Sequence, residues 1–141
     1  IGTWETMREG DSAAILAIGP MVKVAEEAAE LLKREGWNVR VVNARFVKPL
    51  DEAVLSQLAK EHLPILVLEE GAELGGLGAA VLEFYARHQE FRNVSVQIAG
   101  VPDVFVEHAT IKEQRQEAGL TAESVAGRLR AAAVRPRQRA T

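Results

Sequence analysis

Two adjacent carboxylates, Glu69 and Glu70, follow the apolar run 65–68, and a glycine-rich stretch begins directly after them. A pair of carboxyl groups that share a proton can perform general acid–base chemistry. Neighbouring side chains of a strand, however, point to opposite faces of the sheet. We therefore predict that one of these glutamates caps or pairs locally and that the other is solvated.

The glycines of this stretch suggest a second kind of chemistry, the binding of a phosphate group. Gly71, Gly75, Gly76 and Gly78 precede apolar residues at helical spacing, and amide groups at a helix N-terminus attract anions. The dinucleotide-binding pattern is incomplete, because residues 79–81 bring no third glycine, and the stretch follows a late strand. We therefore favour a tight turn, in which glycine lets a strand, a helix or a partner subunit approach closely.

An ion pair between Arg45 and Glu70 is a more specific prediction for this region. Each residue follows the carboxyl end of a predicted strand. In an open α/β sheet the carboxyl ends of parallel strands lie at the same edge, where ligands and partners bind. Such a pair would fix the position of the loop and would not itself do chemistry.

Metal and nucleophile chemistry receive little support from the remaining residues. His62, His88 and His108 are dispersed, and only His108 has possible co-ligands nearby, Asp103 and Glu107, without the convergence that a metal site needs. The chain has no cysteine, which excludes disulfides, thiolate catalysis and thiolate zinc sites and fits a cytoplasmic protein. The residues alone therefore predict a domain without a self-contained catalytic site.

The bulk composition is that of one globular domain. The chain has 141 residues and a net charge of −3, which is too mild to indicate nucleic acid or an acidic membrane surface as a partner. No apolar run approaches the roughly 20 residues that span a membrane. The chain begins with Ile1 rather than methionine, so we expect it to be a piece of a longer protein.

Alternating strands and helices position the candidate residues. Apolar runs predict strands, which are expected within residues 3–8 and at 13–18, 39–42, 65–68 and 94–98. This order predicts a mainly parallel sheet with helices on both faces, and the polar alternation of the last strand places it near an edge.

Residues that commonly start or stop helices indicate the expected helix ends. Pro20, Asp51 and Thr121 suit helix starts, and Gly36 suits a left-handed cap after the first helix. A capping box at residues 110–113 predicts a further short helix, which Gly119 ends. We divide the chain into a domain, residues 1–134, and a basic, disordered tail, residues 135–141.

Two segments resemble the 1-deoxy-D-xylulose-5-phosphate synthase family of transketolase-like thiamine enzymes. They are residues 45–52, Arg-Phe-Val-Lys-Pro-Leu-Asp-Glu, and residues 100–110, Gly-Val-Pro-Asp-Val-Phe-Val-Glu-His-Ala-Thr. A third pattern, residues 68–71 followed by 75–78, is shared across the transketolase superfamily. The resemblance covers nearly the whole chain and lies with the C-terminal domain. It implies a three-layer α/β/α fold with a mixed, mostly parallel five-stranded sheet whose first strand is antiparallel.

The resemblance also implies a function for the parent enzyme. Such an enzyme condenses pyruvate with glyceraldehyde 3-phosphate, with loss of carbon dioxide, in isoprenoid and thiamine biosynthesis. Thiamine diphosphate and Mg²⁺ bind in two preceding domains, so the resemblance assigns no catalytic, cofactor-binding or metal residue here and no cofactor to the fragment, which is expected to be inactive alone. The implied partners are those two domains and a homodimer mate. Candidate contact residues are Arg45, Glu70, Gly75, Gly76 and Gly78.

Two alternatives remain open at this point. One is the C-terminal domain of a 2-oxo-acid dehydrogenase β subunit, which shares the glycine pattern but which the segment 102–110 disfavours. The other is a stand-alone interaction module that keeps the fold without the chemistry. A native start methionine together with a stop codon near Thr141 would favour the module.

Overall fold

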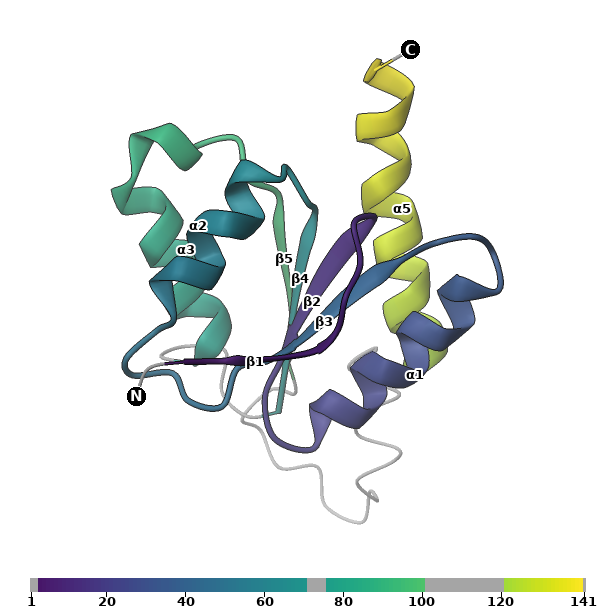
Figure 1. The fold of residues 1–141 in the computed structure, drawn as a ribbon, viewed down its shortest axis with the longest axis horizontal. Helices are drawn as coiled ribbons and strands as arrows, with labels where there is room; N and C mark the ends of the chain where they lie inside the picture. The colour runs from purple at the N-terminus through teal and green to yellow at the C-terminus, as the bar shows by residue number, and fades with distance from the viewer. Residues whose placement is uncertain (1–2, 71–75, 101–120, 141) are drawn as a thin grey trace.

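The computed structural model describes residues 3–70, 76–100 and 121–140 (Figure 1). Some features singled out in the sequence lie outside these ranges. They are Gly71, Gly75, His108 with its possible co-ligands, most of the second synthase-like segment, and the short helix expected between residues 110 and 119.

Five strands of the described residues form one mixed sheet in the order β1-β3-β2-β4-β5. β1 (Glu5–Arg8) pairs antiparallel with β3 (Val39–Asn43). β2 (Ala13–Ala17) is parallel to β3 and to β4 (Ile65–Glu69), and β5 (Val96–Gly100) is parallel to β4. The expected mixed sheet with an antiparallel first strand is confirmed.

Helices cover both faces of the sheet and complete three layers (Figure 1). α1 (Met21–Lys33) and α5 (Ala122–Ala140) pack on one face. α2 (Glu52–Lys60) and α3 (Leu77–Arg87) pack on the other, and a short 3₁₀ turn, η1 (Gln89–Phe91), follows α3. The expected α/β/α arrangement is therefore confirmed.

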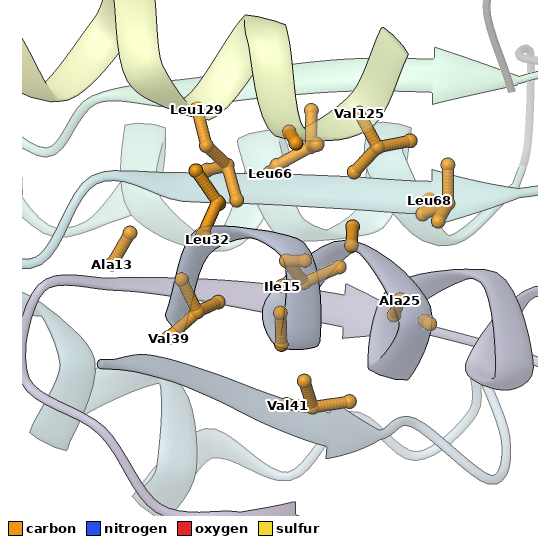
Figure 2. Packing of buried hydrophobic residues seen from close by; sticks show 14 of the residues in the cluster. Ala13, Ile15, Ala25, Leu32, Val39, Val41, Leu66, Leu68, Val125 and Leu129 are labelled. Carbon is orange, nitrogen blue, oxygen red and sulfur yellow. The ribbon is translucent and has the colours of Figure 1, made fainter. Parts of the chain in front are cut away.

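The two central strands, β2 and β4, explain why the sequence reads as continuous apolar runs. Every residue of both strands is buried, because each strand has helices on both faces. Figure 2 shows the face under α1 and α5, where alternate side chains of the sheet meet the two helices. The labelled contacts include Ile15, Val41, Leu66 and Leu68 of the sheet, Ala25 and Leu32 of α1, and Val125 and Leu129 of α5.

The helices begin at the residues that the sequence indicated. Pro20 is the N-cap of α1. The carboxylate of Asp51 caps α2, with Oδ1 accepting a hydrogen bond from Val54 N at 3.2 Å. The hydroxyl of Thr121 accepts from Ser124 N at 3.2 Å at the start of α5. The side chains of Asp51 and Thr121 thus satisfy amide groups that have no partner within the helix, whereas Pro20 makes no side-chain capping bond.

α1 and α2 end in the same hydrogen-bond pattern with different residues. Gly36 N donates to Lys33 O and Trp37 N to Leu32 O after α1. His62 N and the following amide make the equivalent bonds to Ala59 O and Leu58 O after α2. Both patterns are Schellman motifs, which need a left-handed residue; Gly36 has φ 89° and His62 has φ 56°.

Two boundaries differ from the sequence-based expectation. The last strand is residues 96–100 rather than 94–98, because pairing with β4, Ile65 opposite Val96 and Glu69 opposite Gly100, decides its limits. Helix α5 continues to Ala140 and so includes most of the segment 135–141, for which the sequence predicted a disordered tail. The domain limit at residue 134 stays a prediction.

Candidate functional site

Glu69, the last residue of β4, caps helix α3 from the strand. Its carboxylate accepts two backbone hydrogen bonds, Leu77 N to Oε1 and Gly78 N to Oε2, both at 2.8 Å. Gly76, the N-cap of α3, has no side chain that could do this. The side chain is buried, with an exposed fraction of 4% for the residue, and its negative charge lies at the positive end of the helix dipole.

This geometry decides between the chemical interpretations of the stretch. Each oxygen of Glu69 already holds an N–H donor, so the carboxylate is arranged as a structural acceptor rather than as a base facing a substrate. The amides of Leu77 and Gly78, which could have bound a phosphate, are the ones engaged. Glu70 is exposed. The prediction that one of the two glutamates caps locally is confirmed.

Gly78 allows α3 to approach the sheet closely. A Cβ atom on Gly78 would lie 2.7 Å from both Cδ1 and Cγ2 of Ile98 on β5, closer than such carbon atoms pack. Gly76 has an extended backbone, with φ −88° and ψ −168°, which any residue adopts. The close approach at Gly78 is therefore to the domain's own sheet, and a subunit contact by either glycine stays a prediction.

Arg45 and Glu70 are both exposed, and the ion pairs of the described residues do not include one between them. The expected ion pair is thus absent from this part of the chain. A role of either residue at an interface stays a prediction.

Asp51 is the second buried carboxylate of the described residues, and it has a partner that the sequence did not indicate. Its Oδ1 caps α2, while Oδ2 accepts a hydrogen bond from Trp4 N at 2.8 Å. The indole of Trp4 donates to Phe46 O at 3.0 Å. Because 47 positions separate Trp4 from Asp51, no local pattern could have revealed this bond.

A carboxylate near the end of α2 explains the arginine that interrupts β3. The guanidinium of Arg40 donates to both oxygens of Glu61, at 3.0 and 2.8 Å, and Gln57 donates to the same carboxylate at 3.0 Å. These bonds lower the pKa of Glu61 to about 2. The side chain of Arg40 is 15% exposed, so the pair joins β3 to α2 at the margin of the core.

Further polar contacts join the helices to each other. Arg130 of α5 donates to both oxygens of Glu35, after α1, at 2.9 and 2.7 Å. The hydroxyl of Tyr85 on α3 donates to Leu55 O of α2 at 2.7 Å, and burial raises the pKa of this tyrosine. Each contact connects two elements of the domain.

The described residues hold no cluster of three or more His, Cys, Asp or Glu side chains that could bind a metal ion. His62 is exposed at the end of α2, and His88 Nδ1 lies 2.7 Å from Phe84 O. None of the helices in this part of the chain combines the length and apolar composition that crossing a bilayer requires.

Residues 2–125 match the family model for the transketolase C-terminal domain. The chain belongs to this family. The family predicted from the sequence is confirmed.

Curated relatives of this transketolase C-terminal domain include proteins named 1-deoxy-D-xylulose-5-phosphate synthase. The protein of Brevibacillus brevis is 52% identical over 92% of the chain, and that of Halalkalibacterium halodurans is 46% identical over 99%. The chain spans only 20–22% of the length of these relatives. The synthase family indicated by residues 45–52 is therefore supported, and the 2-oxo-acid dehydrogenase alternative is less supported.

Solved structures agree with this assignment. A split-gene transketolase, described as an inactive β4 tetramer, superposes with a TM-score of 0.84 at 34% identity, over 94% of this chain and 43% of that one. Campylobacter jejuni transketolase superposes with a TM-score of 0.65 at 18% identity, over 92% of this chain and 18% of that one, and so supports the fold alone.

Proposed function

We propose that the chain is the C-terminal domain of a 1-deoxy-D-xylulose-5-phosphate synthase and that it acts there as a structural domain. The complete enzyme would condense pyruvate with glyceraldehyde 3-phosphate, releasing carbon dioxide, for isoprenoid and thiamine biosynthesis. The observation that carries the proposal is the identity of 46–52% to synthases along 92–99% of the chain.

The proposed structural role follows from how the buried carboxylates are used. Glu69 and Asp51, the buried acidic residues of the described ranges, each accept two hydrogen bonds from backbone amides of the same domain. A thiamine enzyme needs carboxylates that face the cofactor and its metal. The described residues hold no cluster of three or more His, Cys, Asp or Glu side chains, and we route no chemical step through this domain.

The cofactor and the partners belong to the proposal as well. Thiamine diphosphate and Mg²⁺ would bind to the two preceding domains of the complete enzyme, and none to this chain alone. The domain would pack against those domains and against a homodimer mate in the cytoplasm. A similar split-gene transketolase chain is described as an inactive β4 tetramer, and this description is consistent with a domain that is inactive without its partners.

A paired experiment tests the proposal. The chain and the complete gene product are each titrated calorimetrically with thiamine diphosphate in the presence of Mg²⁺ and assayed with pyruvate and glyceraldehyde 3-phosphate. We expect binding and turnover from the complete protein and neither from the chain alone. Turnover by the chain would refute the structural role. A complete protein that uses ketose phosphates but not pyruvate would refute the synthase.

A further inference from the structure

We propose that Asp51 is a positioning residue that fixes where the polypeptide enters this domain. Its buried carboxylate holds Trp4, just before β1, against the N-terminus of α2. This inference rests on the proposed function in one respect, because it takes the residues before Trp4 to lead to the preceding domains of the synthase. The clamp would then set the direction in which the domain is attached to them.

The burial of side chains shows that the N-terminal end of the chain is anchored to the core at Trp4 rather than along β1. Trp4 has an exposed fraction of 4% and packs in the core cluster that lies under α2 and α3. The first three residues of β1 are exposed, and β1 is an edge strand with an irregular register after Thr6. An edge strand with exposed side chains contributes little apolar burial, so the apolar burial at this end of the chain comes from the indole of Trp4, while β1 itself is held by backbone pairing with β3.

The hydrogen bonds divide between two elements in a way that favours a clamp. One oxygen of Asp51 serves α2 and the other serves Trp4, at 3.2 and 2.8 Å. The indole N–H adds a bond at 3.0 Å to Phe46 O, in the loop between β3 and α2. Capping α2 needs only the contact from Oδ1 to Val54 N. The carboxylate is therefore used beyond its capping role, and its second oxygen ties the chain entry to the same loop.

One substitution separates the two uses of the carboxylate. In Asp51→Ser the hydroxyl still caps α2, because serine is a good N-cap, but it offers one oxygen on a shorter side chain for both donors. Asp51→Ala removes both contacts. Thr121→Ala is the matched control, because it removes a cap of the same kind from α5 and leaves Trp4 untouched.

Hydrogen exchange measured by mass spectrometry on the full chain gives the decisive readout. In Asp51→Ser we expect amides of residues 3–8 to exchange about ten-fold faster or more, with the protection of α2 unchanged. Asp51→Ala should loosen both segments, and Thr121→Ala should loosen only the start of α5. Unchanged exchange at residues 3–8 in Asp51→Ser, or equal loss across the whole domain, would overturn the proposal.

The same variants in the complete synthase separate this inference from the proposed function. There we expect faster exchange in the peptide that joins the preceding domain to residue 8, with synthase activity still measurable. If an Asp51 variant of the complete protein exchanges at this junction as the wild type does while it still makes product, the clamp is wrong and the function stands. If the wild-type complete protein makes no product while the variants still loosen the junction, the function is wrong and the clamp stands.

Discussion

Replacing Glu69 by glutamine tests the capping of α3 with the smallest change in shape. Glutamine keeps one oxygen and can accept from one of the two amides, Leu77 N or Gly78 N, as a neutral acceptor. Its NH₂ group then faces the other amide, donor against donor. Weakening the first bond costs about 0.5–1.5 kcal/mol and leaving the second buried N–H unpaired costs about 1–3 kcal/mol. We expect a total loss of about 2–4 kcal/mol.

The assay is urea unfolding of the chain followed by far-UV circular dichroism, with Glu27→Gln as the control. Glu27 is exposed on α1, so the same chemical change there should alter the free energy of unfolding by less than about 0.5 kcal/mol. Native-state hydrogen exchange of the Leu77 and Gly78 amides locates the effect, since these two should lose protection first.

A loss below about 1 kcal/mol for Glu69→Gln, or a loss equal to that of the control, would refute the argument. It would mean that the two amides find other partners once the carboxylate is gone. A full loss without a local change at the start of α3 would also contradict it, because the cost would then arise elsewhere in the core.

Three further predictions concern the helix ends and one ion pair. His62→Gly removes the strain of a side chain on a left-handed backbone (φ 56°) and should raise the free energy of unfolding in urea by about 0.5–1 kcal/mol. An unchanged free energy of unfolding would show that His62 is not strained. Gly78→Ala places a methyl group 2.7 Å from carbons of β5 and should lower the free energy of unfolding by roughly 1–3 kcal/mol. The control Gly127→Ala has open space around the new methyl group and should not destabilise the chain. Equal shifts in the melting temperature of the two variants would refute the packing argument. The Arg40 guanidinium lowers the pKa of Glu61 from 4.5 to about 2, so the stability from this pair is complete above pH 4.5 and is lost as the pH falls towards 2. Over that range urea midpoints should fall more steeply for the wild type than for Glu61→Gln, and parallel curves would count against the pair.

Most elements could be predicted because their signals are local. The apolar runs of β2 and β4 indicate strands with two covered faces, and the structure buries both strands completely. The caps at Asp51 and Thr121 and the left-handed Gly36 were predicted from residue type and spacing and are confirmed. The limits of β5 were shifted by two residues, because pairing with a neighbouring strand decides them.

The candidate site was predicted only in part. Adjacent glutamates at the end of a strand must face opposite sides, so the sequence could say that one would cap and the other would not. The sequence could not say which of the two glutamates would cap, because that depends on which face of the sheet α3 covers. The Arg45–Glu70 ion pair does not form within the described residues, because two residues at the same edge of a sheet can pair but need not do so.

The sequence by itself determined the periodicity of the chain and the caps of α2 and α5, since residues within a few positions decide each of them, and its motifs indicated the family. The tertiary structure decided which polar groups meet across long separations. Trp4 reaches Asp51 across 47 positions, and Glu69 reaches the amides that begin α3, because the sheet brings their elements together. A buried carboxylate is stable only where donors converge on it, and that convergence is a property of the folded chain.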